Sequence, residues 1–113
     1  MGNFHRDFTI GEATYVGGAN NLGTVYQLVN NGGNYTLDTI FDFDGTHGAN
    51  PIGNLLIDAS GSLFGTTYYG GASGVGTVFE IDYSGGGYAT TPTILASFDG
   101  TNNANPTAGL IAD

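Results

Sequence analysis

The chain carries one sequence pattern twice. Residues 17–35 match residues 70–88 at 9 of 19 positions, and residues 43–58 match residues 98–113 at 9 of 16 positions. Similarity at a fixed period is the signature of architectures in which each unit is too small to bury its own apolar face and stacks on a neighbour. The repeat therefore constrains the fold more than any single segment does.

The spacing between the copies gives the length of the unit. The offset is 53 residues up to a two-residue insertion near Thr90, Thr91 and Pro92, and 55 residues after it. The 113 residues suffice for one small assembly and no more. We expect residues 17–69 and 70–113 to be its repeat segments, with residues 1–16 as a partial repeat.

Both copies have the two-residue period of β-strands. In residues 77–82, for example, Phe79 and Ile81 share one face and Glu80 takes the other. Glycine-rich turns separate the β-branched and aromatic runs, and no stretch has the 3.6-residue apolar period of a helix. Strands are predicted at residues 38–43, 53–58, 62–69, 77–82 and 93–98, with a degenerate strand at 8–15 and a further one at 106–113.

Four antiparallel strands in about 53–55 residues are typical of a β-propeller blade. The predicted fold is all-β, with two four-stranded antiparallel propeller-like blades that are circularly permuted relative to the blade. The alternative is a stacked β-solenoid, whose coils are usually shorter. On the blade interpretation, we expect Phe79 and Ile81, with Tyr26 and Leu28, to be buried between the blades.

Charge and composition exclude several classes of function. The chain has ten acidic residues and one basic residue, Arg6, so its net charge is −9. A phosphate backbone or an anionic membrane surface needs several positive charges, which this chain does not supply. The chain has no lysine and no cysteine, which removes Schiff-base, P-loop, thiol and zinc–thiolate chemistry. No stretch is long and apolar enough for membrane insertion. We expect no cofactor and no metal.

One longer run identifies a family. Residues 50–81 read NPIGNLLIDASGSLFGTTYYGGASGVGTVFEI. This unit resembles the GloVer tandem repeat, and the resemblance covers about two units. Membership implies an exported bacterial repeat protein with a propeller-like fold, often with a separate C-terminal anchoring segment. It implies no catalytic residues.

Recurring acidic positions are the first candidates for chemistry. Asp44 and Asp99 each precede a glycine, and they supply oxygen atoms of the kind that calcium prefers. The EF-hand spacing is missing, however, and Asp-Gly is also a common turn. Asp42 and Asp44 imitate a paired-carboxylate acid–base site, but the second copy has Ser97 in place of Asp42. The turn interpretation is preferred for these residues.

Histidine and serine give weaker signals. His5 and His47 lie 42 residues apart with no third ligand, which makes a poor zinc site, so we expect His47 to face solvent in a loop. Ser60, Ser73 and Ser84 adjoin glycine, yet none lies in a G-x-S-x-G motif. No residue is therefore assigned to catalysis, to a cofactor or to a metal.

Tyr15, Tyr68 and Tyr69 suggest a platform for carbohydrate, because exposed aromatic faces beside Asn and Asp bind sugars. Packing between adjacent sheets is the alternative for the same three rings.

The leading hypothesis is a non-enzymatic structural repeat protein, extracellular or at the cell surface, that assembles with other copies of itself. Strand 106–113 of one copy would pair beside strand 8–15 of the next, head to tail, and build a propeller-like ring or a helical filament. The alternative is a β-propeller module that binds carbohydrate or another surface ligand, and a glycosidase-like enzyme ranks third.

Overall fold

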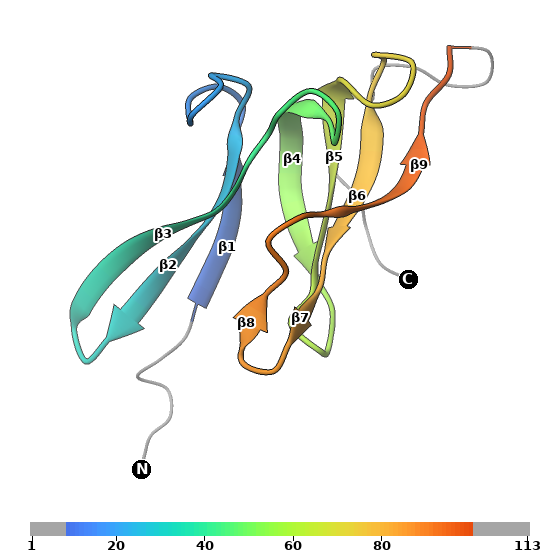
Figure 1. The fold of residues 1–113 in the computed structure, drawn as a ribbon. Helices are drawn as coiled ribbons and strands as arrows, with labels where there is room; N and C mark the ends of the chain where they lie inside the picture. The colour runs from blue at the N-terminus through green and yellow to red at the C-terminus, as the bar shows by residue number, and fades with distance from the viewer. Residues whose placement is uncertain (1–8, 101–113) are drawn as a thin grey trace.

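The computed structural model describes residues 9–100, and this part of the chain is all β-structure without a helix (Figure 1). The fold class and the absence of helix agree with the sequence prediction. No helix in the described part is long and apolar enough to cross a membrane. The strands are β1 (Thr9–Thr14), β2 (Thr24–Asn31), β3 (Asn34–Asp42), β4 (Ala49–Ile57), β5 (Leu63–Tyr69), β6 (Thr77–Ile81), β7 (Tyr83–Ser84), β8 (Gly87–Tyr88) and β9 (Thr93–Ser97).

The strands form two main sheets, whose boundary does not coincide with the sequence segments 17–69 and 70–113 because β4 and β5 lie in the second sheet. From here on, the first repeat means the unit of β1–β3 up to Phe43, and the second repeat means the unit of β4–β9. The first sheet has the order β1-β2-β3, the second has the order β4-β5-β6-β9, and β7 and β8 form a short hairpin. All ladders between these strands are antiparallel. Separate antiparallel sheets are not the pairing of a stacked solenoid, in which successive coils share continuous sheets.

Only one of the two sheets has the four strands that the sequence predicted. The second sheet is a four-stranded meander, but the described part of the first sheet ends at β1. The strand predicted at residues 106–113 lies outside the described residues, as does most of the partial repeat before β1.

The two sheets repeat the same local structure. Thr14 Oγ1 and Thr24 Oγ1 lie 2.9 Å apart across β1 and β2, and Thr67 Oγ1 and Thr77 Oγ1 lie 2.8 Å apart at the positions 53 residues later. A β-bulge also recurs, between Val25 and Tyr26 in the first sheet and at the equivalent residues of the second. The sequence identities therefore correspond to one structural unit used twice.

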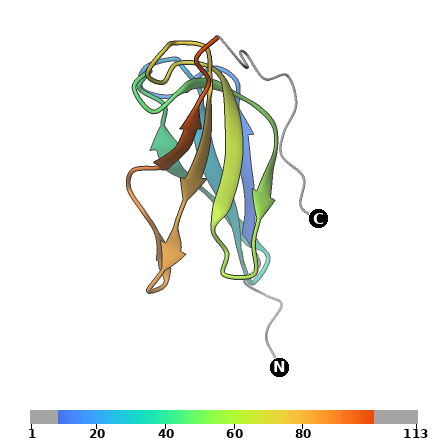
Figure 2. The same ribbon diagram turned by 90° about the vertical axis from the view of Figure 1, so that its right-hand side faces the viewer.

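The glycine loops also repeat, and they gather at one end of both sheets (Figures 1 and 2). The Gly23 N–H donates to the Gly17 carbonyl at 3.0 Å, and the Gly76 N–H donates to the Gly70 carbonyl at the same distance. The first loop lies against the second repeat, because the Asn50 N–H donates to the Leu22 carbonyl and the Asn50 side chain donates to the Tyr15 carbonyl. Hydrogen bonds at this end thus hold the repeats together.

The repeats differ in their hairpins. In the first, β2 and β3 continue to the turn at Gly32 and Gly33. In the second, the ladder stops after β6, and the separate β7–β8 hairpin carries the turn. Pro92 and the two-residue insertion precede β9, and a proline has no N–H for the ladder. The insertion thus bends this hairpin away from its sheet.

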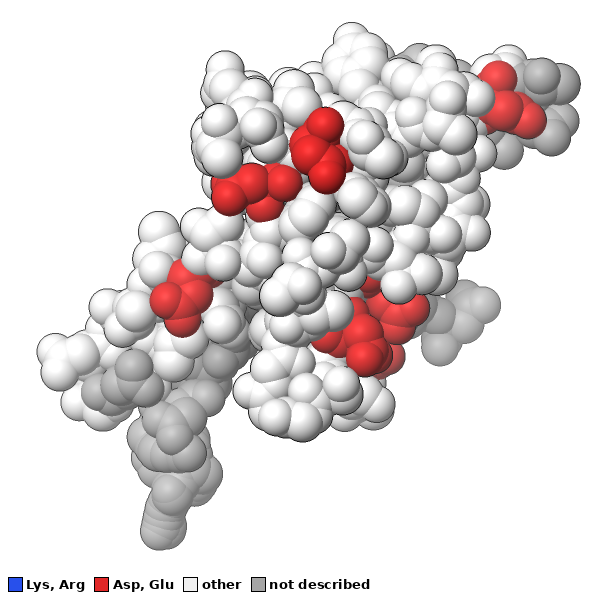
Figure 3. All heavy atoms as spheres, viewed as in Figure 1, with Lys and Arg blue, Asp and Glu red and all other residues white. Residues whose placement is uncertain are grey.

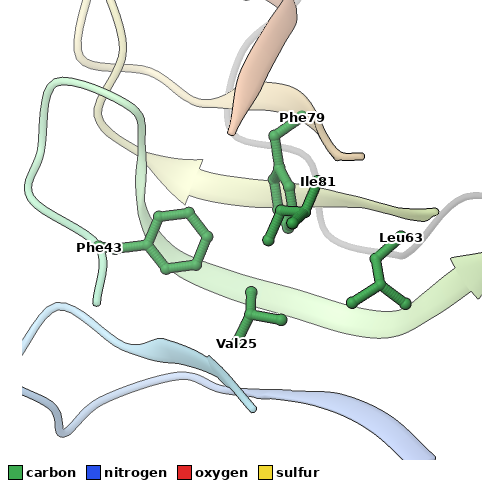
Figure 4. Packing of buried hydrophobic residues seen from close by; sticks show 5 residues of the cluster. All are labelled: Val25, Phe43, Leu63, Phe79 and Ile81. Atoms are coloured by element: carbon green, nitrogen blue, oxygen red, sulfur yellow. The ribbon is translucent and has the colours of Figure 1, made fainter. Parts of the chain in front are cut away.

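The core lies between the two sheets (Figure 4). The Phe43 and Phe79 rings meet edge to face with centroids 5.3 Å apart. Gly65 makes room for the Phe79 ring, because a Cβ on Gly65 would lie 2.7 Å from Phe79 Cζ. The fully buried apolar side chains of this cluster are Val25, Phe43, Leu63, Phe79 and Ile81.

The predicted burial of one strand face was correct for the second repeat and wrong for the first. Phe79 and Ile81 are fully buried, but Tyr26 and Leu28 are half-exposed. The reason is that the two sheets meet through opposite faces of equivalent strands. Val25, on the opposite face of β2 from Tyr26, packs into the core, so the face of Tyr26 and Leu28 points away from the junction.

Candidate functional site

An open cleft of about 460 Å³ lies between the two repeats. Gln27 of β2 faces it from the first sheet, and the β7–β8 hairpin borders it from the second repeat. A second hollow of about 250 Å³ continues it toward β3 and shares Gln27 and Tyr88. The cleft is lined by Gln27, Ile57, Gly61, Tyr83, Gly86, Gly87 and Tyr88.

Two tyrosines form the aromatic wall of this cleft. Tyr83 and Tyr88 are paired residues across the β7–β8 hairpin, and their rings meet at 4.8 Å between centroids and 62° between planes. Burial raises the pKa of the Tyr88 hydroxyl, and the neighbouring Tyr83 raises it further. An upward shift leaves a phenol protonated at neutral pH, as it is at its ordinary pKa, so the Tyr88 hydroxyl keeps its hydrogen-bond donor.

A buried serine fixes the hairpin that carries these tyrosines. Ser62 Oγ accepts a hydrogen bond of 3.0 Å from the Tyr83 N–H and donates one of 3.3 Å to the Asp82 carboxylate. The Ser62 N–H in turn donates to the Asp58 carboxylate at 3.0 Å. Ser62 thus ties the hairpin to β5 and keeps two carboxylates close to the cleft.

The electrostatic character of the molecule is acidic over the described range. Figure 3 shows carboxylates spread over one face, with one group near the lower end of the second sheet. Residues 9–100 contain no lysine or arginine. An anionic ligand would find no compensating charge here, so the cleft suits a molecule that carries no negative charge.

Asp44, the first acidic candidate, closes a turn. Its carboxylate accepts hydrogen bonds from the His47 N–H at 2.9 Å and from His47 Nδ1, which lies 2.9 Å from Asp44 Oδ2. Partial burial alone would raise the pKa of the Asp44 carboxyl, but these hydrogen bonds and the charge of His47 hold it below its usual value. The Asp44 carboxylate thus bonds to the backbone three residues further along the chain, and its role is to close this turn.

Asp42 and Asp44 flank the buried Phe43 but have different partners. Asp42 Oδ1 accepts from the Ala19 N–H at 3.1 Å, whereas Asp44 pairs with His47. Asp99, the repeat equivalent of Asp44, is exposed. Among the side chains of residues 9–100, no group of three or more His, Asp or Glu residues could hold a metal ion.

The prediction for His47 needs correction, and His5 lies outside the described residues. The His47 side chain is 29% exposed and pairs with Asp44, so it is not a free solvent-facing group. It also meets the Phe41 ring edge to face at 5.8 Å. Ser60 and Ser73 are exposed in turns, and Ser84 is exposed in β7.

The three tyrosines of the predicted sugar platform lie elsewhere. Tyr15 and Tyr69 are each about half exposed, at 48% and 47%, and Tyr68 meets Tyr69 edge to face at 4.6 Å. They line neither of the two hollows described above.

Comparison with known protein families identifies the family to which the repeat belongs. The Gloeobacter/Verrucomicrobia repeat family matches residues 7–113. The chain belongs to this family. The resemblance seen in residues 50–81 is thereby confirmed over nearly the whole chain. No curated protein and no solved structure gives a significant match.

The cleft of this Gloeobacter/Verrucomicrobia repeat protein escaped the sequence analysis. Tyr83 and Tyr88 flank a predicted turn, and Gln27 is 56 residues before Tyr83 in the chain. The insertion at Thr90 and Thr91 was the one available signal, because it marks where the second hairpin departs from the first.

Proposed function

We propose that the chain is a non-enzymatic, extracellular structural repeat protein whose role is to assemble with other copies of itself. The observation that supports this is the composition of the core. Val25 and Phe43 come from the first repeat, and Leu63, Phe79 and Ile81 come from the second. Stacking of one repeat on the next is therefore what buries apolar surface, as in other repeat proteins.

The stacking brings together different faces of equivalent units. The first sheet contributes the Val25 side of β2, and the second contributes the Phe79 side of β6. Val25 and Phe79 are not equivalent in the repeat, since Val78 is the residue 53 positions after Val25. A contact between unlike faces is heterologous, and it continues into a ring when its rotation closes or into a filament when it does not.

Pairing of a strand from one copy with the sheet of the next would link the copies through backbone hydrogen bonds. Residues 98–113 repeat residues 43–58, so segment 106–113 carries the sequence of β4, which pairs with β5 in the second sheet. The equivalent of β5 in the first sheet is β1, an edge strand within residues 9–100. In the proposal, segment 106–113 of one copy pairs with β1 of the next, so the sheets become four-stranded propeller-like blades.

Light scattering after size exclusion tests this proposal. We expect species at multiples of 11.6 kDa that grow with concentration, and rings or filaments by electron microscopy. Deleting residues 106–113 should shift the population to monomer, because β1 loses its proposed partner. A folded monomer at every concentration, indifferent to the deletion, would contradict the proposal.

A second candidate function is carbohydrate binding in the inter-repeat cleft. Tyr83 and Tyr88 offer aromatic surface, Gln27 offers an amide, and the acidic surroundings do not exclude an uncharged sugar as they would an anion. Glycines at positions 86 and 87 leave the space in front of the rings open. The cleft thus has the mixture of apolar wall and few polar groups that small-molecule sites have.

Filling the cleft tests this second function. A Cβ on Gly87 meets nothing within 4 Å, so Gly87→Leu should fold normally while its side chain occupies the cleft. Asn34→Leu, at the equivalent hairpin position of the first repeat, is the matched control. On a glycan array, any sugar bound by the wild type should lose about ten-fold or more in affinity with Gly87→Leu only. Binding of no glycan by the wild type, or equal binding by both variants, would contradict this candidate.

A further inference from the structure

The junction between the two repeats covers one face of each sheet, and the other face of each sheet remains for a neighbouring copy. We call the side of each sheet that carries Phe79 or its equivalent the front face, and the opposite side the back face. In the first sheet the front face carries Tyr26 and Leu28, and in the second sheet the back face carries Val78 and Glu80. Within the chain, the back of the first sheet packs on the front of the second.

The two outward faces carry the same residues as the two buried ones. Val78 is the repeat equivalent of the buried Val25, and Phe98 is the equivalent of the buried Phe43. On the other outward face, Tyr26 and Leu28 are the equivalents of the buried Phe79 and Ile81. All four outward side chains are only partly buried, unlike their fully buried equivalents.

From this correspondence we infer that a second copy of the chain packs the front face of its first sheet on the back face of the second sheet, in the register of the internal junction. This inference rests on the proposed function and names the surfaces it uses. Val78 then takes the place of Val25 and meets Tyr26 and Leu28 of the next copy. Phe98 takes the place of Phe43, whose ring meets Phe79 at 5.3 Å inside the chain.

A backbone hydrogen bond at the internal junction also has its equivalent groups at the two outward faces. The Gly71 N–H donates to the Gly45 carbonyl at 2.9 Å across the internal junction. Their equivalents are Gly18 on the front side and Gly100 on the back side. The Gly18 N–H of the next copy is therefore placed to donate to the Gly100 carbonyl.

Charge makes the contact between copies weaker than the internal one. Glu80 stands where the first repeat has Gln27, and Glu12, which pairs with Tyr26 across β1 and β2, stands where the second repeat has Gly65. The facing sheets of two copies thus bring carboxylates together that the internal junction lacks. Like charges repel, so assembly should strengthen with ionic strength.

Cross-linking tests the register directly. The natural chain has no cysteine, so Tyr26→Cys with Val78→Cys introduces the only two thiols. Facing sheets lie about 10 Å apart and a disulfide needs Cα atoms within about 7 Å, so a short bis-maleimide is the suitable linker. The two positions lie on outward faces of different sheets. We expect a covalent ladder from the double variant and nothing beyond a dimer from either single variant.

The outcomes separate this inference from the proposed function. A ladder with 26-to-78 links between chains supports the inference. Links of 26 to 26 and 78 to 78 indicate an isologous dimer and overturn it. If the wild type assembles by light scattering but the double variant gives no ladder, the register is wrong and the proposed function stands. If nothing assembles, both fail.

Two substitutions at the proposed contact provide an independent test. Glu80→Gln restores the residue type of the internal junction, and the dissociation constant of the assembly should fall about two- to five-fold. Val78→Asp buries a charge in the contact, and the constant should rise at least about ten-fold. Both side chains lie on the outward face and are partly exposed, so both variants should keep the circular dichroism spectrum of the wild type. Unchanged constants in both variants would overturn the inference.

Discussion

Replacing Phe79 with alanine is expected to lower the free energy of unfolding by about 3–5 kcal/mol. The side chain is fully buried, its ring meets Phe43 of the other repeat at 5.3 Å, and Gly65 leaves the space that it fills. The variant leaves a cavity at the junction that neither sheet can close without moving the other. For a domain of this size the melting temperature should fall by at least about 10 °C.

Tyr26→Ala is the matched control, because Tyr26 is the repeat equivalent of Phe79. Tyr26 keeps part of its surface exposed, so its loss should cost about 1–2 kcal/mol, less than the loss of the fully buried Phe79. Circular dichroism during urea titration measures both variants, at a concentration where light scattering finds monomer. Equal losses would show that the front faces of the two sheets are buried alike, contrary to the structure.

The strands could be predicted because their information is local. Alternation along residues 77–82 and the glycine-rich turns located β6 and its neighbours to within a few residues, and the repeat transferred each assignment to the other copy. The fourth strand of the second sheet also matched, since β9 covers Thr93–Ser97 and the prediction was residues 93–98. Boundaries were less accurate at β4, which begins at Ala49, four residues before the predicted start at residue 53.

The features that escaped prediction are non-local. Alternation shows that Tyr26 and Val25 face opposite ways, but it does not show which of them meets the other repeat. The cleft depends on a hairpin of one repeat and a strand of the other, so its residues carry no common motif. In the sequence, Asn102 is the repeat equivalent of His47, so the repeat pattern gave no signal for the His47–Asp44 pair.

A glycine at the junction is the second position where we expect a large effect. Gly70 has a φ of +82°, and a Cβ there would lie 2.6 Å from the Gly48 carbonyl carbon, 2.7 Å from Gly48 Cα and 2.8 Å from the Ala49 nitrogen. These atoms are backbone of the segment that joins the two repeats, so they cannot rotate away as a side chain would. The expected cost of Gly70→Ala is about 2–5 kcal/mol, from left-handed strain and steric overlap together.

Gly17 separates these two contributions, because it is the repeat equivalent of Gly70 with the same loop conformation and an open surrounding. Its φ is +97°, and a Cβ on it would meet nothing within 4 Å. Gly17→Ala should therefore cost only the strain of about 1–2 kcal/mol. The difference between the two variants in urea unfolding reports mainly on the close approach of the repeats, since both loops close with the same hydrogen bond six residues apart, from Gly23 to Gly17 and from Gly76 to Gly70. Equal costs would mean that the Gly70 loop is free of Gly48, and the packing of the two repeats described above would then be wrong at this end.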